Sequence, residues 1–191
     1  MSVWAKNNKS LFIHIPKTAG TAIERWLENN GGGKFLGNKS NHNDKHSDMF
    51  DKRNKNILSD KEVFCFSCVR HPYTLVVSAY FYINKWPQFK AAPFTLEDWI
   101  FKDKMLEDTW NGVCRKLQHE YLDLDRLDYL MKFENLDEDF QRIMQHFNSL
   151  TPLYNHEQFI SKTSTVTLTD DMKEKVYNHY KRDFEIFDFS I

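Results

Sequence analysis

The sequence predicts an α/β fold of three layers (α/β/α), in which helices cover both faces of a central, mainly parallel sheet. Short apolar runs alternate along the chain with longer segments that have the periodicity of amphipathic helices. The run at residues 63–69 is almost continuously apolar, which is typical of a strand buried on both faces. Of the 191 residues, 41% are hydrophobic and 15% aromatic, enough for a packed core. We therefore expect a single domain over residues 1–191.

The individual elements follow from local patterns. Strands are expected at residues 11–15, 34–36, 63–69 and 129–133. Helices are expected after Gly20, over Pro72–Ile83 with Pro72 as first helical residue, after a cap at Thr95, from Leu136 to Phe147, and after a cap at Thr169. Residues 29–56 are rich in Gly, Asn, Lys and Asp, so we expect long loops there, and long loops in compact domains are often functional.

Charge and cysteine usage narrow the class of protein. The net charge of −1 gives no general electrostatic reason to expect nucleic acid or an anionic membrane as partner. We find no apolar run long enough for a signal peptide or a membrane span. Cys65 and Cys68 lie three apart on an expected strand and so point to opposite faces, which excludes a shared metal ion or a redox pair. We expect a reduced, cytoplasmic protein.

The first candidate anion site is the turn Ile-Pro-Lys-Thr-Ala-Gly-Thr-Ala at residues 15–22. Main-chain N–H groups at a helix start bind phosphate readily, and the helix dipole favours negative charge there. Gly20 would allow close approach to a ligand, Thr18 and Thr21 would add hydroxyl donors, and Lys17 a mobile positive charge. The alternative is a plain strand–turn–helix junction with a surface lysine, and the spacing alone leaves both interpretations open.

This turn differs from the Walker A loop of ATP-dependent kinases. GxxxxGK[ST] places Lys directly before Ser or Thr, whereas Lys17 precedes Gly20 by three residues. A small kinase that binds ATP and Mg²⁺ therefore lacks its main signature here.

The second candidate segment is Phe-Ser-Cys-Val-Arg-His-Pro-Tyr-Thr-Leu-Val-Val-Ser-Ala-Tyr at residues 66–80. Arg70 follows an expected strand, and Ser78 lies nearly two turns into the next helix. A guanidinium group suits bidentate phosphate binding, and a serine hydroxyl adds a donor. Taken alone, the segment favours another interpretation, with an Arg that caps a sheet edge and a Ser that allows close helix packing.

Together, IPKTAGT and VRHPYTLVVSAY resemble the 5′-phosphosulfate loop and the 3′-phosphate motif of sulfotransferases that use 3′-phosphoadenosine-5′-phosphosulfate (PAPS). The resemblance is closest to the carbohydrate-modifying, Golgi-type branch and its bacterial relatives. It continues at residues 45–47, 118–122, 132–136 and 180–187. Two departures concern His71, where the family often has Asn or Asp, and Thr74-Leu75, which replace an acidic–basic pair.

The resemblance implies a P-loop-like fold, PAPS as the sulfuryl donor, adenosine 3′,5′-bisphosphate as product, and no metal ion. The main chain of Thr18, Ala19, Gly20, Thr21 and Ala22 would hold the 5′-phosphate together with the two threonine hydroxyls. Lys17 would lie near the bridging oxygen, where charge grows in the transition state. Arg70 and Ser78 would hold the 3′-phosphate. Lys162, in a loop that would close over the nucleotide, is a further candidate phosphate contact.

The acceptor must lose a proton, so a general base is expected. His46 is our candidate by resemblance, with a suitable pKa range for a histidine. Glu24 is the alternative, although its spacing from Thr21 differs from that of relatives that use a helix glutamate. His14, in the first strand, fits a hydrogen-bonded core residue better than a metal ligand.

These patterns predict transfer of a sulfuryl group to a hydroxyl, or less favourably an amine, of a carbohydrate or small molecule. A non-catalytic module that binds adenosine bisphosphate or a sulfated glycan is the alternative, and a small kinase ranks below it. Lys17 argues against a binding module, because simple binding needs no cation at the bridging oxygen.

Overall fold

The computed structural model describes residues 2–36, 47–85, 94–106, 114–153 and 166–191. The chain divides into two compact units, Met1–Arg70 with Glu120–His156 and His71–His119 with Glu157–Ile191. Each unit has a hydrophobic cluster of its own. The candidate residues of the first half of the chain up to Arg70 thus belong to the first unit.

The first unit is built on a five-stranded sheet with the order β3-β1-β2-β4-β5. Its strands are β1 (Val3–Ala5), β2 (Ser10–Ile13), β3 (Lys34–Phe35), β4 (Phe64–Val69) and β5 (Tyr129–Lys132). β2, β4 and β5 pair in parallel, whereas β1 is antiparallel to both β2 and β3. Four of these five strands therefore run in one direction, and the predicted mainly parallel sheet is confirmed.

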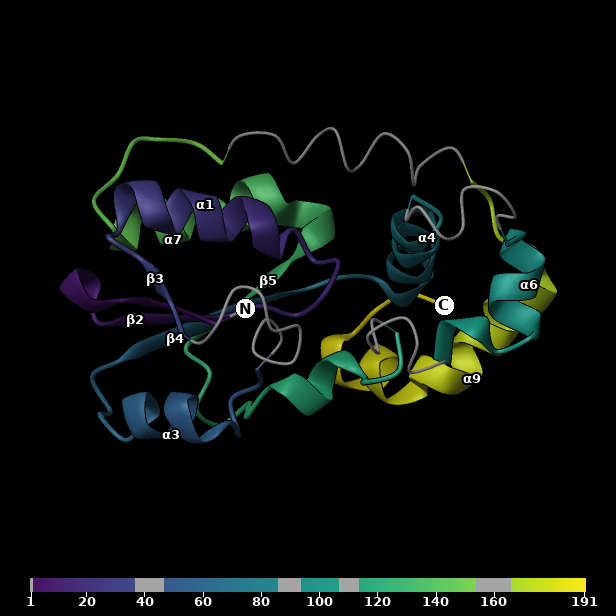
Figure 1. Cartoon of the computed structure of the whole chain (residues 1–191), viewed down its shortest axis with the longest axis horizontal. Coiled ribbons are helices and arrows are strands. Elements are labelled where there is room, and N and C mark those ends of the chain that lie inside the picture. The colour runs from purple at the N-terminus through teal and green to yellow at the C-terminus, as the bar shows by residue number, and fades with distance from the viewer. Residues whose placement is uncertain (1, 37–46, 86–93, 107–113, 154–165) are drawn as a thin grey trace. The chain divides into compact units, whose positions relative to one another are not determined.

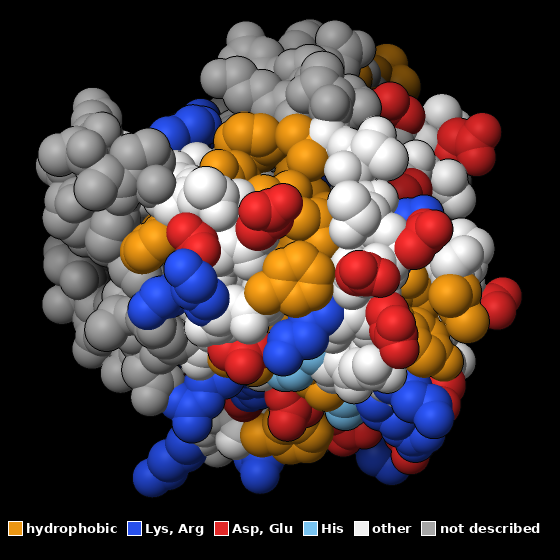
Figure 2. Space-filling model, turned by 90° about the vertical axis from the view of Figure 1, so that its right-hand side faces the viewer, with side chains coloured by type: hydrophobic (Ala, Val, Ile, Leu, Met, Phe, Trp, Pro, Cys, Tyr) orange, Lys and Arg blue, Asp and Glu red, His pale blue; other side chains and the backbone are white. Residues whose placement is uncertain are grey.

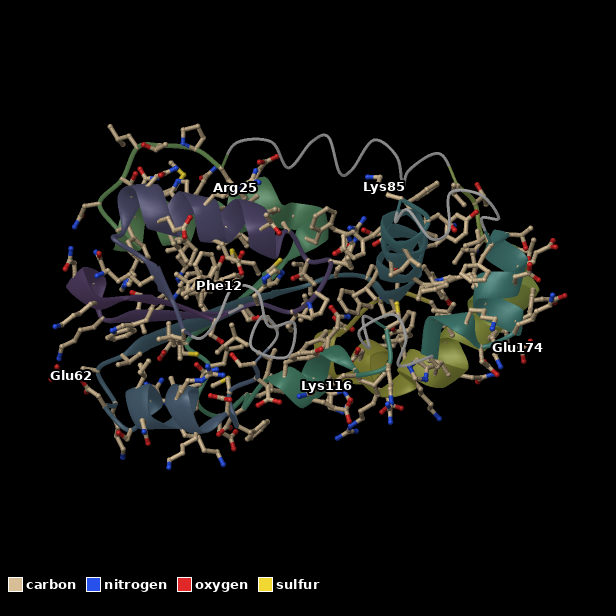
Figure 3. All side chains as sticks on the ribbon, viewed as in Figure 1. Phe12, Arg25, Glu62, Lys85, Lys116 and Glu174 are labelled. Carbon is tan, nitrogen blue, oxygen red and sulfur yellow. The ribbon has the colours of Figure 1, made fainter. Side chains whose placement is uncertain are left out.

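Helices lie on both faces of this sheet (Figure 1). α1 (Gly20–Asn30) and α7 (Leu136–His146) cover one face, and α3 (Lys52–Leu58) lies against the other. Phe12 points from β2 into the space under α1 and α7 (Figure 3), where Trp26 meets Phe140 edge-on with ring centroids 5.0 Å apart. This arrangement confirms the predicted α/β fold with three layers.

The cysteines of β4 behave as packing residues. Cys68 belongs to the cluster under α1 and α7, whereas Cys65, on the opposite side of the strand, is not part of it. Both are buried with free thiols, and burial raises the pKa of Cys65 to about 12. Since the thiolate is the reactive form, both residues serve as packing residues of the core.

The second unit is helical, with α4 (Pro72–Ile83), α6 (Leu96–Phe101), α9 (Asp170–Phe187) and the 3₁₀ turn η2 (Lys104–Leu106). Trp99 and Tyr180 are fully buried in its cluster. Thr95 and Thr169 accept hydrogen bonds from Asp98 N and Met172 N, so both predicted caps are confirmed. Among the helices that the structure describes, none is long and apolar enough to cross a bilayer.

The sequence patterns missed β1 and α3. β1 has three residues, too few for an alternating pattern. α3 is mostly polar and buries one residue, Asn54, whose amide donates to Ser2 Oγ at 2.9 Å. The prediction of long loops over residues 29–56 was therefore wrong at residues 29–30, where α1 ends, and at residues 52–56. In α3, an Asp51 cap and one buried amide hold a helix without an apolar face.

Candidate functional site

Three neighbouring parallel strands end at one edge of the first unit's sheet. The loop of residues 15–19 comes shortly after β2, Arg70 directly after β4, and Phe133 directly after β5. Ligands of open α/β sheets bind at the carboxyl ends of the strands. The candidate site of the first unit is therefore this edge.

The main chain of the loop has an unusual conformation. Lys17 and Ala19 have positive φ angles of 68° and 65°, and Thr18 between them does not. Such left-handed geometry costs a residue with a side chain about 1–2 kcal/mol, so contacts around the loop have to offset it. Main-chain N–H groups in alternating conformations of this kind converge into concave anion sites.

The start of α1 lacks the cap that most other helices have. Side chains cap α3, α4, α6 and α9, whereas the residue at this position in α1, Ala19, makes no capping hydrogen bond through its side chain. No main-chain acceptor for the N–H groups of Gly20 and Thr21 occurs in the part of the chain that the structure describes. These donors and the positive end of the helix dipole are thus open to an anion.

The two threonines of the motif differ in what they can offer a ligand. Thr18 is fully buried, and its hydroxyl donates to the carbonyl oxygen of Ile15 at 2.9 Å. Because a hydroxyl has one hydrogen, the proposed hydroxyl donation from Thr18 to phosphate does not fit this conformation. Thr21 is exposed at the helix start, so of the two hydroxyls that of Thr21 is the one accessible to a ligand.

Gly20 is required by a neighbouring side chain. A Cβ at this position would lie 1.9 Å from Cδ2 of His14. His14 Nδ1 is in turn 2.6 Å from Oε1 of Glu24, and both side chains are buried. The prediction of His14 as a hydrogen-bonded core residue is confirmed. Glu24, the alternative general base, is 2% exposed and faces this histidine.

Arg70 joins the ends of all three strands. Its Nη1 donates to the carbonyl oxygen of Lys17 at 3.2 Å, and its guanidinium carbon lies 3.9 Å from the centre of the Phe133 ring. Burial lowers the pKa of Arg70 to about 10, while Glu134 acts in the opposite direction, so the side chain remains a cation at neutral pH. The structure therefore places the guanidinium of Arg70, assigned to one end of the nucleotide, against the main chain of Lys17, which is assigned to the other end.

The remaining predicted residues lie elsewhere. Ser78 is half-buried on α4 in the second unit. His46 and Lys162 lie outside the described residues. The roles of all three stay predictions.

Sequence reasoning missed two histidine–carboxylate pairs. One is His14–Glu24. The other lies in the second unit, where Asp183 accepts from the main-chain N–H groups of Gln118 at 2.9 Å and His119 at 3.0 Å, and lies 2.7 Å from His119 Nδ1. This contact gives the segments at residues 118–122 and 180–187 a shared purpose, because Asp183 orders the start of the 3₁₀ turn η4 (Gln118–Tyr121). The sequence signal for the first pair was a Glu one helical turn after Gly20.

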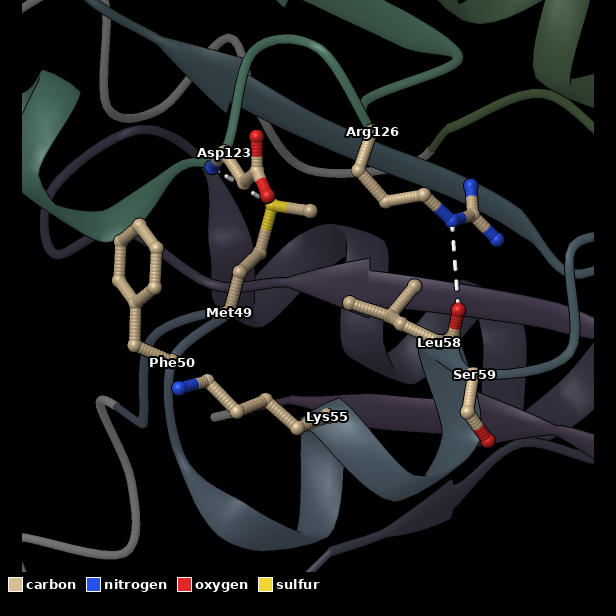
Figure 4. Close-up of a pocket in the computed structure, with 7 residues that line it drawn as sticks. All are labelled: Met49, Phe50, Lys55, Leu58, Ser59, Asp123 and Arg126. Atoms are coloured by element: carbon tan, nitrogen blue, oxygen red, sulfur yellow. Dashed lines mark hydrogen bonds between the residues drawn. The ribbon is translucent and has the colours of Figure 1, made fainter.

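A separate hollow of about 220 Å³ lies beside α3 in the first unit (Figure 4). Met49, Phe50 and Lys55 contribute to its wall, together with Arg126. Arg126 donates to the main-chain oxygens of Asp60 at 3.1 Å and Val63 at 2.7 Å, so its charge serves to tie loops together. None of the described residues predicted to bind the nucleotide lines this hollow.

The face shown in Figure 2 has no extended patch of charge of one sign outside the grey atoms. In Figure 2, acidic and basic side chains are interspersed among hydrophobic ones outside the grey atoms. Within the described ranges, no three His, Cys, Asp or Glu residues gather closely enough to hold a metal ion.

Comparison with known proteins identifies the family. A family model described as the sulfotransferase family matches residues 2–190. Neither the curated proteins nor the solved structures include a match to this chain.

Proposed function

Because the chain belongs to the sulfotransferase family, we propose that it transfers the sulfuryl group of PAPS to a hydroxyl of a carbohydrate or small-molecule acceptor. The family match spans both units, which supports the further proposal that residues 1–191 act as one sulfotransferase domain. Adenosine 3′,5′-bisphosphate would be the second product.

The observation that carries the proposal is the uncapped start of α1. Its open N–H groups, the left-handed residues Lys17 and Ala19, and the exposed Thr21 hydroxyl together suit a bound 5′-phosphosulfate. Arg70 donates a hydrogen bond to the Lys17 carbonyl of this loop, and this proximity supports the assignment of Arg70 to the 3′-phosphate of the same nucleotide. The role of Ser78 at that phosphate rests on the family resemblance.

Lys17 would stabilise the transition state. In the transfer, the acceptor oxygen forms a bond to sulfur while the bond between sulfur and the bridging oxygen breaks, and the electron pair stays on the bridging oxygen. A cation held there stabilises the growing negative charge more than it stabilises the bound substrate. The acceptor proton goes to a general base, for which His46 remains our candidate; the burial of Glu24 against His14 argues against the alternative.

A direct assay tests the proposal. The protein would be incubated with PAPS labelled in the sulfuryl group and a panel of oligosaccharides and small alcohols, and we expect label in an acceptor together with adenosine 3′,5′-bisphosphate. Thermal-shift measurements would accompany it, because a ligand that binds only the folded state raises the melting temperature. Stabilisation by adenosine 3′,5′-bisphosphate without label transfer would favour a binding module, and stabilisation by ATP with Mg²⁺ alone would favour a kinase.

A further inference from the structure

We propose that His14 and Glu24 form a positioning pair that joins the two ends of the loop of residues 15–19 and holds the loop in the conformation that binds the donor's 5′-phosphosulfate. The inference rests on the proposed function, and it assigns both residues an indirect role through the loop. Neither residue is proposed to touch the donor.

The position of the pair in the chain supports this role. His14 immediately precedes the loop, and Glu24 lies one turn into the helix that follows it. Their 2.6 Å contact therefore joins the two ends of the loop across its base. A contact at this place fixes how far α1 starts from the end of β2, and that spacing sets the loop's conformation.

The imidazole is held on several sides. The Phe12 ring stacks on it at an interplanar angle of 20°, with centroids 6.2 Å apart. Gly20 lies against its Cδ2–Nε2 edge so closely that a methyl group would not fit. With Glu24 at its Nδ1 and Gly20 against its other edge, the ring acts as a spacer under the first residue of α1.

Other contacts fix the top of the loop. Thr18 binds back to the Ile15 carbonyl, and Arg70 binds the Lys17 carbonyl. Together with the His14–Glu24 contact at the base, these bonds offset the cost of the left-handed conformations of Lys17 and Ala19. A loop held at its base and its top is preorganised before the donor arrives, which saves ordering cost on binding.

Stability alone explains the pair poorly. Burying two ionisable groups is costly, and apolar residues of similar size often serve a core equally well or better. Burial lowers the pKa of His14 well below its ordinary value, so the ring is neutral, and its Nδ1–H donates to Glu24. A directional bond of this kind fixes a geometry that apolar packing would leave looser.

The test measures how much the 5′-phosphate contributes to binding. For each variant, isothermal titration gives the dissociation constants of adenosine 3′-monophosphate and adenosine 3′,5′-bisphosphate. The first constant divided by the second reports how much the loop's contact with the 5′-phosphate contributes to binding. We expect Glu24→Ala and Gly20→Ala to lower this ratio by about tenfold to a hundredfold, the scale for a misplaced binding group. The affinity for adenosine 3′-monophosphate itself should change little, because Arg70 is retained.

Two matched variants separate positioning from general damage. Gly31→Ala also drives a methyl group into a ring, 2.5 Å from Cε1 of Phe147, but at the far end of α1, and it should leave the ratio unchanged. Glu24→Gln keeps an oxygen acceptor for His14 and should keep most of the ratio that Glu24→Ala loses.

The outcomes are distinguishable. If wild-type protein binds neither nucleotide, or binds both equally, the proposed function fails. If the wild-type ratio is large and the Glu24→Ala and Gly20→Ala proteins, shown to be folded by circular dichroism, retain it, the positioning role is wrong while the function stands. The positioning role would also be wrong if the Glu24→Ala and Gly20→Ala proteins lost affinity equally for both nucleotides, or if Gly31→Ala lowered the ratio as well.

Discussion

Two histidine–carboxylate pairs among the described residues have nearly equal lengths and different roles. His14 Nδ1 lies 2.6 Å from Glu24, and His119 Nδ1 lies 2.7 Å from Asp183. The first pair is buried on both sides, with side chains 7% and 2% exposed, and it spans the base of the anion loop in the first unit. In the second pair, Asp183 is fully buried, His119 is 24% exposed, and the carboxylate also accepts two main-chain N–H groups.

The difference shows that the role of such a pair follows from what its members also contact. Asp183 supplies acceptors for the start of a 3₁₀ turn, so its value lies in stability. Glu24 contacts the His14 ring, which lies against Gly20, so Glu24 serves to fix the loop's geometry. Changes on the loop side should therefore alter ligand binding and turnover, and changes at Asp183 should alter unfolding.

The largest effect is expected at Lys17 on the loop side. Lys17→Ala should lower kcat by about 10²–10³, the loss seen when one donor to a developing negative charge is removed. Single-turnover assays with labelled PAPS would measure this, with the urea midpoint as a control for folding. Near-normal turnover would remove Lys17 from catalysis and weaken the contrast.

Asp183→Ala should act on stability. Two main-chain donors and His119 lose a buried acceptor, so the free energy of unfolding should fall by about 3 kcal/mol. Urea denaturation measures the loss, and Asp183→Asn, which keeps one acceptor oxygen, should lose less. The assignment of Asp183 to stability is wrong if Asp183→Ala leaves the free energy of unfolding unchanged and instead abolishes the contribution of the 5′-phosphate to nucleotide binding.

A smaller, pH-dependent effect is expected at His14. Burial, with the positive charge of Lys17 acting in the same direction, lowers its pKa well below the ordinary value of 6.5. Below pH 6.5 the unfolded chain therefore binds a proton that the folded chain does not, so stability falls as the pH falls, by about 1.4 kcal/mol per unit at most, and is unaffected above it.

Urea midpoints at neutral pH and near pH 5.5 would reveal this loss of stability. The drop in midpoint between the two pH values should be smaller in His14→Gln than in wild type. His146, whose pKa is also lowered by burial, is an exposed residue, so His146→Gln should change the drop less. Equal drops in wild type and His14→Gln would show that His14 takes up its proton in the folded state.

Much of the fold was predictable because it depends on local patterns. The apolar run that forms β4, Pro72 at the start of α4, and the threonine caps of α6 and α9 each act within a few residues. β1 and α3 were not predictable, because β1 exists through its pairing with β2 and β3, and α3 through the Asp51 cap and the buried Asn54.

The site divides in the same way. The motif placed Lys17, Gly20 and Arg70 at strand ends, and the structure brings them to one edge of the sheet. The sequence did not reveal that the Thr18 hydroxyl turns inward or that Phe133 supports Arg70. These contacts join residues far apart in the chain, or depend on a main-chain conformation that residue types alone leave open.

The central claim is that Lys17 and Arg70 grip one doubly phosphorylated adenosine, and isothermal titration with adenosine 3′,5′-bisphosphate tests it most directly. We predict one nucleotide bound per wild-type chain and an affinity at least about tenfold weaker in Arg70→Ala, a loss of about 1.4 kcal/mol. Unchanged affinity in a folded Arg70→Ala protein, or no binding by wild type, would contradict it.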